Sequence, residues 1–280
     1  MDSLLAINWT VDPTIFSLGP VSVRWYGLFF ALAFFLGHNV LGRIFKHEKI
    51  NERWLDAALM YVMVGTVIGA RLGHVFFYGP YFDHVDEYGR QVEGYLSHPF
   101  SILEIWNGGL ASHGAAIGII LACWLYSTKV SKRPVLWILD RVVITVALAG
   151  FFIRSGNLMN HEIVGTTTDL PFAFIFNRGQ FQGVPRHPAQ LYEAICYLGI
   201  FLALMFAYWK KDAGKKLGLL FGLFLVLIFG VRFMVEFVKE EQTHYAHSLP
   251  LRMGQILSLP LVLAGLFFIA RSRNRPLKEG

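Results

Sequence analysis

The sequence predicts an all-α polytopic membrane protein, in which seven transmembrane helices carry a small head and a surface-lying arm on one side of the bilayer. Only 16% of the 280 residues are charged and 55% are hydrophobic, with a mean hydropathy of +0.48. Soluble proteins are about a quarter charged. The apolar residues also gather in runs of roughly 17 to 23, about the length that a helix needs to cross ~30 Å of hydrocarbon. These observations exclude an ordinary cytosolic enzyme, a coiled coil and a disordered chain.

The apolar runs define seven spans within a single transmembrane domain over residues 1–280. The sequence contains no internal repeat and no linker to a second domain. Glycines at helical spacing in the second and third spans predict close helix packing there: Gly65, Gly69, Gly73, Gly114 and Gly118. The predicted spans lie at residues 23–41, 55–77, 110–126, 135–153, 189–209, 217–237 and 253–270.

The distribution of basic residues predicts the orientation. If the first 22 residues lie outside, four cytoplasmic segments hold 15 of the 25 Lys and Arg residues, and the outer segments hold six. Short cytoplasmic loops retain Lys and Arg, so the N-terminus is expected outside and the C-terminus inside. The net charge of +6 then reflects topology and contact with anionic membrane lipids. No nucleic-acid partner is needed to explain it.

Two outer segments are longer than simple turns. Residues 78–109 carry acidic residues with Gly and Pro punctuation and predict an arm that lies on the membrane surface. Residues 154–188 predict a head loop, in which PFAFIF followed by NRGQFQG favours a small hairpin with Gly179 and Gly183 at its bends.

Charged residues inside the apolar runs are candidates for function, because an Arg near the bilayer centre costs at least ~2.5–3.5 kcal/mol. Arg141 follows Asp140 near the cytoplasmic start of its span, where snorkelling or a local ion pair is a sufficient explanation. Arg232 and Glu236 stand four residues apart on one face of the sixth span and predict a buried, functional pair. The other two such arginines are Arg24, which lies close enough to the surface to snorkel, and Arg71.

Polar residues also collect at the outer ends of the spans. Arg71 and Tyr78 share a face of the second span, and arginines that converge inside a membrane indicate an anionic ligand such as a phospholipid phosphate. His113 lies among glycines at the mouth of the third span, where it is either functional or simply hydrogen-bonded in place. Pro188 starts the fifth span, whose Gln190 and Glu193 share a face.

The segment RSGNLMNHEIVG, residues 154–165, follows the fourth span with Gly156 and Gly165 at its expected bends. It is either a functional polar cluster or a loop whose side chains cap its own backbone. Together with the polar ends of the spans, it predicts one cavity that faces the outer half of the bilayer. The polar residues of this segment are Arg154, Asn157, Asn160, His161 and Glu162.

Six motifs in order along the chain resemble those of the prolipoprotein diacylglyceryl transferase family, which acts in the bacterial inner membrane. They are RWYG at 24–27, GARLGHVFFY at 69–78, GGLASHGAAIG at 108–118, RSGNLMNHEIVG at 154–165, RHPAQLYE at 186–193 and GVRFMVEFVKE at 230–240. The resemblance implies seven spans, a small periplasmic head, a periplasmic N-terminus and a cytoplasmic C-terminus.

The resemblance also implies the reaction. The diacylglyceryl group of phosphatidylglycerol passes to the lipobox cysteine of a prolipoprotein signal peptide, a thioether forms and glycerol phosphate leaves. No metal or soluble cofactor is expected. The functional residues carried over by position are Tyr26, His113, Arg154, Asn157, Glu162, Gly165, Arg232 and Glu236. The pattern of polar residues adds Arg71, Tyr78, Asn160 and Gln190 as substrate-binding candidates.

The transfer of a diacylglyceryl group to a thiol requires residues of the same types. A thiol with a pKa near ~8.5 attacks as the thiolate, so a base such as His113 must accept its proton. Arg154 and Arg232 are expected to clamp the phosphate, with Glu162 and Glu236 orienting the two guanidinium groups. Tyr26 and Asn157 are expected to hydrogen-bond the headgroup. Two rival interpretations are weaker. An anion transporter predicts repeats between the two halves of the chain, and the sequence shows none. An intramembrane protease needs a serine in a GxSG turn at the start of a helix, whereas Ser155 lies beside Arg154.

Overall fold

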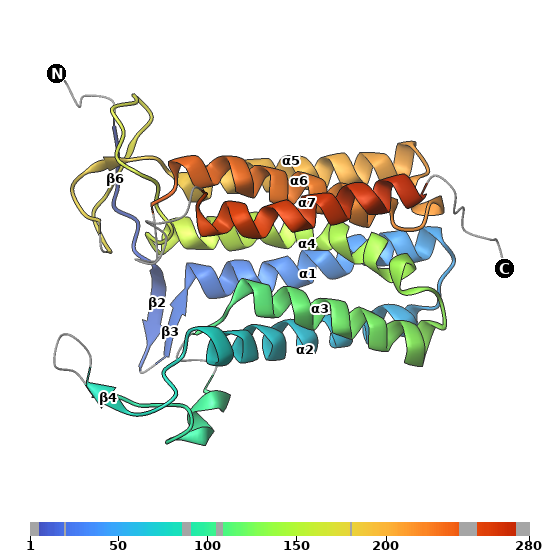
Figure 1. Ribbon diagram of the computed structural model, residues 1–280, viewed down its shortest axis with the longest axis horizontal. Helices are drawn as coiled ribbons and strands as arrows, with labels where there is room; N and C mark the ends of the chain where they lie inside the picture. Colours follow the sequence, from blue (N-terminus) through green and yellow to red (C-terminus); the bar gives the residue numbers. More distant parts are fainter. Residues whose placement is uncertain are drawn as a thin grey trace. The chain divides into compact units, whose positions relative to one another are not determined.

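The computed structural model describes residues 6–19, 21–85, 91–104, 109–179, 181–240 and 251–272. These ranges contain seven helices that are long and apolar enough to cross a membrane, which confirms the predicted fold class (Figure 1). The helices are α1 (Trp25–His47), α2 (Glu52–Phe77), α3 (Ser112–Tyr126), α4 (Val135–Met159), α5 (Ala189–Lys210), α6 (Leu219–Val235) and α7 (Met253–Ser272). A π-helical turn, η3 (Ser127–Ser131), extends α3.

Two helices extend furthest beyond the predicted spans. Helix α1 continues to His47, past the expected end at residue 41, and α4 continues to Met159, past residue 153. The apolar run ends at the first charged residues, whereas the backbone hydrogen bonds of a helix continue through the polar headgroup region. The extension of α4 makes Arg154 and Asn157 helical, and their spacing of three residues places them on one face.

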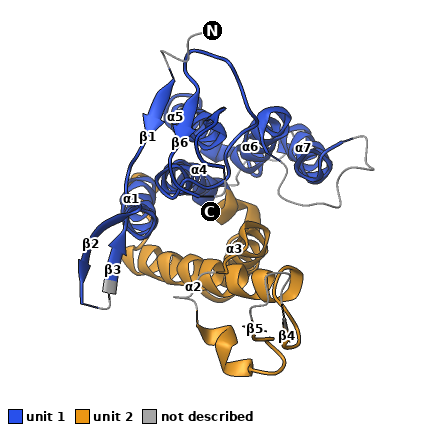
Figure 2. Ribbon diagram, turned by 90° about the vertical axis from the view of Figure 1, so that its left-hand side faces the viewer, with its two compact units in different colours: residues 1–44, 140–280 blue, residues 45–139 orange. Residues whose placement is uncertain are grey.

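The chain divides into two compact units (Figure 2). Unit 1 consists of residues 1–44 and 140–280, and it contains α5, α6, α7 and most of α1 and α4. Unit 2 consists of residues 45–139, and it contains α2, α3 and the arm that joins them.

Unit 2 is held together by the predicted glycine contacts between α2 and α3. A Cβ atom on Gly65 would lie 2.7 Å from the carbonyl oxygen of Gly118, and one on Gly73 would lie 2.6 Å from the Cα of Gly114. No larger residue fits at this spacing without separating the helices. The arm contains the strands β4 (His84–Val85) and β5 (Gln91–Val92) and the 3-10 helix η1 (Pro99–Leu103).

In unit 1, α6 packs against α5 and α7. The carboxylate of Asp140 in α4 accepts hydrogen bonds from the backbone N–H groups of Gly218 (2.7 Å) and Phe221 (2.8 Å) at the start of α6. Arg141 donates to the carbonyl of Gly214 (3.2 Å) in the turn η4 (Ala213–Lys215). Both side chains are buried, so Arg141 does not snorkel to the surface. This charged pair anchors the connection between α5 and α6.

The head of unit 1 is built on a three-stranded sheet in the order β1 (Ile7–Trp9), β6 (Phe174–Phe176) and β7 (Pro185–Arg186). Strands β6 and β7 form the predicted antiparallel hairpin, with Gly179 and Gly183 at positive φ between them. Strand β1 adds a parallel partner that the local pattern does not predict. A second hairpin, β2 (Thr14–Leu18) with β3 (Val21–Arg24), leads into α1.

The head is fastened to the end of α4 by an apolar cluster. Leu158 and Val164 are buried against the β6 residues Phe174 and Phe176. The indole N–H of Trp9 donates to the carbonyl of Leu158 (3.0 Å). The segment after α4 is therefore held on a packed base, and its polar side chains are correspondingly fixed in position.

Candidate functional site

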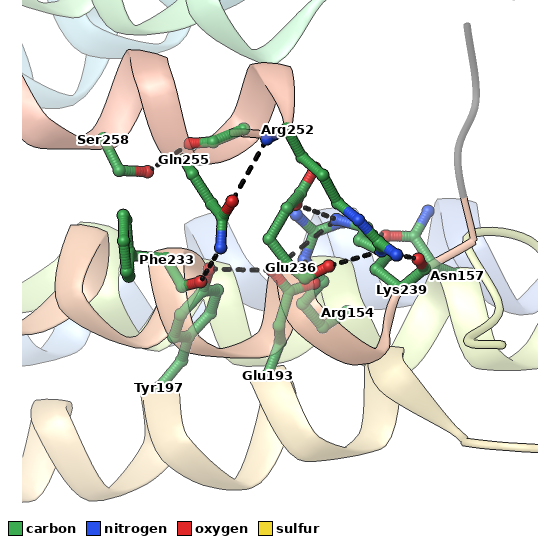
Figure 3. A network of polar contacts seen from close by, with 11 residues as sticks. Arg154, Asn157, Glu193, Tyr197, Phe233, Glu236, Lys239, Arg252, Gln255 and Ser258 are labelled. Carbon is green, nitrogen blue, oxygen red and sulfur yellow. Dashed lines mark hydrogen bonds and ion pairs between the residues drawn. The ribbon is translucent and has the colours of Figure 1, made fainter. Parts of the chain in front are cut away.

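Arg154 forms the centre of a buried polar network in unit 1 (Figure 3). Its Nε lies 2.7 Å from Oε2 of Glu193 in α5, and these side chains are only 12% and 1% exposed. Its Nη1 donates to Oδ1 of Asn157 at 3.0 Å. The hydroxyl of Tyr197 donates to the other carboxylate oxygen of Glu193 at 3.4 Å. Two different elements, α4 and α5, therefore fix the orientation of the Arg154 guanidinium.

The carboxylate of Glu162 is held by two amides. Asn157 Nδ2 donates to Oε2 at 3.2 Å, and Asn160 Nδ2 donates to Oε1 at 2.9 Å. The amide of Gln190, which is fully buried in α5, donates to the Glu162 carbonyl at 2.7 Å. Asn157 thus joins Glu162 to Arg154, and the predicted polar cluster forms.

The orienting roles of the carboxylates differ from those expected. Glu162 does not pair with a guanidinium among the described residues, and Glu193 takes that position on Arg154. The reason is geometric: Glu162 lies in the loop after α4, where the amides of the preceding helical turn are nearest. Glu193 points from the second turn of α5 toward α4.

Arg232 and Glu236 share the face of α6 that the sequence predicts, but within the described residues they form no ion pair. Glu236 begins the turn η5 (Glu236–Val238), and its Oε2 lies 3.9 Å from Nζ of Lys239. Its carboxylate is turned toward α7, where Gly254 leaves room for it: a Cβ atom on Gly254 would lie 2.5 Å from Oε1. Arg252 donates to the carbonyls of Glu236 (2.6 Å) and Lys239, and so ties the end of α6 to the start of α7.

Gly165 lies where three segments of the chain approach closely, those that contain Gly165, His187 and Val238, and a larger residue does not fit there. Its N–H donates to the carbonyl of His187 (2.8 Å), and the N–H of Thr166 donates to the carbonyl of Val238 (2.9 Å). A Cβ atom on Gly165 would lie 2.5 Å from that Val238 oxygen. Gly165 also forms an antiparallel bridge with Lys239. The geometry gives Gly165 a positioning role, since it sets the segment that carries Lys239.

Tyr26 enters the same region from the first turn of α1. Its ring lies on Gly156 of α4, where a Cβ atom would lie 2.7 Å from the ring. Gly156 is therefore a helical packing residue and does not form the predicted bend. Tyr26 interacts electrostatically with Glu162 and Arg154.

Unit 2 contains three of the predicted site residues. Arg71, buried in α2, donates to the backbone carbonyls of Ile102 (2.8 Å), Ser101 (2.6 Å) and Gly109 (3.2 Å). Its guanidinium also lies over the ring of Tyr95 at 5.2 Å. These contacts fasten the arm to α2 and give Arg71 a positioning role there. Its predicted role in binding lipid stays a prediction.

His113 lies in the first turn of α3 and is half-buried. Its ring contacts those of Phe77 (5.2 Å) and Tyr78 (5.5 Å), and His74 stacks on Tyr78 at 6.2 Å. His113 and Tyr78 are thus neighbours within unit 2, as are Tyr26, Arg154 and Glu162 within unit 1.

Three charged residues of the network are not among the predicted site residues, namely Glu193, Lys239 and Arg252. Glu193 carried a signal, because it shares a helical face with Gln190. Lys239 also carried one, because it stands three residues after Glu236 in the same motif. Within the described ranges no group of three or more His, Cys, Asp or Glu residues is arranged to hold a metal ion.

Comparisons with known proteins address the family directly. The family model described as prolipoprotein diacylglyceryl transferase matches residues 13–271. A relative from Chloroherpeton thalassium, named phosphatidylglycerol–prolipoprotein diacylglyceryl transferase, is 46% identical over 272 residues, which cover 97% of this chain and 96% of the relative. Relatives of the same name from Porphyromonas gingivalis and Tolumonas auensis are 43% and 44% identical, and cover 98% and 94% of this chain and 97% and 96% of their own lengths. The resemblance in the motifs is confirmed, and the chain belongs to the prolipoprotein diacylglyceryl transferase family.

Proposed function

We propose that this protein transfers the diacylglyceryl group of phosphatidylglycerol to the lipobox cysteine of prolipoprotein signal peptides. The observation that carries the proposal is the cluster of Arg154, Arg232 and Lys239 in unit 1, at the ends of apolar helices. Cations gathered in such a place favour an anionic lipid phosphate. The names of the relatives supply the lipid and the acceptor.

The reaction exchanges one carbon–oxygen bond for one carbon–sulfur bond. The thiolate attacks the glyceryl carbon that carries the phosphate oxygen, and the bond between that carbon and oxygen breaks. The electron pair stays with the phosphate, which leaves as glycerol phosphate with one additional negative charge. We assign the thiol proton to His113, because histidine is the side chain that most often serves as a general base in enzymes. The phosphate is assigned to the arginines.

The amides around Glu162 suit a glycerol headgroup. Oδ1 of Asn160 and Oε1 of Gln190 are buried and accept no hydrogen bond from the described residues. Buried acceptors are normally satisfied, and the hydroxyls of the headgroup glycerol are donors. Asn160 and Gln190 are therefore assigned to headgroup recognition, next to Asn157, Tyr26 and Glu162.

We place the protein in the bacterial inner membrane, with the N-terminus in the periplasm and the C-terminus in the cytoplasm. The bias of Lys and Arg toward alternate loops supports this orientation. The arm within residues 78–109 exposes large apolar side chains, including Phe82 (68%) and Phe100 (84%). Such side chains suit a segment that lies in the membrane interface.

The proposal is tested with purified protein in phosphatidylglycerol liposomes and a synthetic lipobox peptide, read by mass spectrometry. The expected result is a diacylglyceryl-sized mass gain that is lost with a serine-for-cysteine peptide and with Arg232→Ala. Absence of any gain, with lipid and peptide both shown to bind, would overturn the proposal. For the base, His113→Gln is expected to lower the rate most at the acidic end of the range from about pH 6 to 9. Full activity of this variant throughout would exclude His113 as the base.

A further inference from the structure

Lys239 is a buried cation to which the proposed reaction assigns no specific role. Its side chain is only 8% exposed, although lysine is almost never fully buried without a partner. Two carboxylate oxygens face its ammonium: Glu193 Oε1 at 3.8 Å and Glu236 Oε2 at 3.9 Å. Both distances exceed the length of a hydrogen bond. Among the described residues, the three N–H donors of Lys239 therefore have charge partners nearby but no acceptor within hydrogen-bond range.

Arg154 shows the opposite situation within the same network. Its Nε and Nη1 are engaged at 2.7 Å and 3.0 Å by Glu193 and Asn157. A guanidinium held in this way contributes charge, but its orientation is fixed by its protein partners. Lys239 has N–H donors that no described acceptor engages at hydrogen-bond distance, and ammonium groups commonly bind phosphate as compact point charges.

The backbone around Lys239 is fixed by three contacts, so the binding of a phosphate there involves a movement of the side chain alone. Lys239 bridges to Gly165, its carbonyl accepts from Arg252, and its N–H donates to the carbonyl of Glu236 (3.4 Å). Figure 3 shows this side chain on the side of the network occupied by Arg154 and Asn157.

We propose that Lys239 binds the phosphoryl oxygens of the lipid headgroup and stabilises the glycerol phosphate as it leaves. This assignment rests on the proposed function. The phosphodiester carries one negative charge before the carbon–oxygen bond breaks, and the leaving phosphate monoester carries two. A cation with uncommitted donors at that position acts more strongly on the transition state than on the bound lipid, so it is expected to raise kcat more than it lowers KM.

Lys239→Met removes the charge and keeps much of the apolar stem. We expect kcat to fall about 10- to 100-fold, the loss typical of one charge-assisted hydrogen bond, while KM for phosphatidylglycerol changes far less. Inhibition by added glycerol phosphate should weaken in parallel. Lys239→Arg should restore most of the rate. Lys215→Met, which removes a 71% exposed lysine paired with Asp212, is the matched control and should leave kcat unchanged.

The pH profile supplies a readout that a merely structural lysine would not move. Burial lowers the pKa of Lys239 below its usual value, the Arg154 and Arg232 charges act in the same direction, and Glu193 and Glu236 oppose them. The rate should therefore fall as the pH rises through that pKa and the ammonium loses its charge. Arginine does not titrate in this range, so Lys239→Arg should move the alkaline decline to higher pH. Arg252, which donates to the Lys239 carbonyl, and Tyr197, which donates to Glu193, are the same in both proteins.

Each outcome decides the assignment. Unchanged kcat and unchanged inhibition by glycerol phosphate in a folded Lys239→Met protein would overturn it. If Lys239→Met does not fold, the pH profile of Lys239→Arg decides, and an unmoved alkaline decline would overturn the assignment. If the wild type transfers no lipid, the proposed function fails separately. In that case, the binding of glycerol phosphate to the wild type and to Lys239→Arg is measured as a function of pH. If both proteins lose binding at the same pH, the assignment of Lys239 is overturned.

Discussion

The ion pair between Arg154 and Glu193 provides a direct test of how the network is stabilised. The pair is 2.7 Å long and almost fully buried, and the second oxygen of Glu193 also faces Lys239 at 3.8 Å. Glu193→Gln keeps the volume of the side chain but leaves two buried cations facing a neutral amide. Removal of one partner from a buried pair costs about 3–5 kcal/mol.

Because glutamine can still accept a hydrogen bond from Arg154, we expect the lower end of that range, about 3 kcal/mol. For a chain of this size, about 2–4 °C is lost per kcal/mol, so the apparent melting temperature should fall by about 6–12 °C. The measurement is thermal unfolding of the purified protein in detergent, followed by intrinsic fluorescence.

Asp12→Asn is the matched control. Asp12 pairs with Arg178 at 2.8 Å, nearly the same distance, but those side chains are 55% and 50% exposed. Exposed pairs contribute little because water and salt screen them, so the melting temperature of this variant should stay close to that of the wild type. If Glu193→Gln melts no lower than Asp12→Asn, the buried pair does not stabilise the protein and the electrostatic reasoning is wrong.

Two further predictions concern the anchors outside this network. Asp140→Ala leaves the N–H groups of Gly218 and Phe221 without their acceptor, at about 1–3 kcal/mol each, so thermal unfolding should show a loss of about 2–6 kcal/mol. Partial recovery is expected in Asp140→Asn, and an Ala variant as stable as the wild type would contradict the anchor. Arg71→Met removes three hydrogen bonds to arm carbonyls, so limited proteolysis within residues 78–109 should accelerate while the helices unfold at a similar temperature. Equal cleavage rates in both proteins would show that Arg71 does not hold the arm.

The helices of this fold are readable from the sequence because each is encoded locally. An apolar run of sufficient length predicts a span, and glycines at positions such as Gly65 and Gly118 predict a close crossing. The ends of the helices are less predictable. The run that defines α4 stops at Arg154, yet the backbone continues as a helix to Met159. That difference converts Arg154 and Asn157 from loop residues into neighbours on one helical face.

The head shows where local patterns stop being informative. The β6–β7 hairpin has its signal in a short alternating segment with glycines at the bends. Strand β1 pairs with β6 across more than 160 residues, Ile7 opposite Phe174, and a three-residue strand carries no mark of its partner. Such a pairing is selected by the packing of Trp9 and Phe174 in the assembled head.

The charged residues of the site are also only partly predictable from local sequence. Arg154 and Arg232 stand out in the sequence because a guanidinium in an apolar run is costly. Lys239 follows its span, so by composition it is one more outer basic residue. Its burial is produced by residues distant in the sequence, since Gly165 allows the close approach of the segment that contains Lys239, and Arg252 donates to the Lys239 carbonyl. Glu193 is likewise an ordinary residue of the first turns of α5 until Arg154 is packed against it. A motif search finds the residues whose local setting is unusual, whereas the partners that fix their charge and orientation come from segments that meet only in the folded protein.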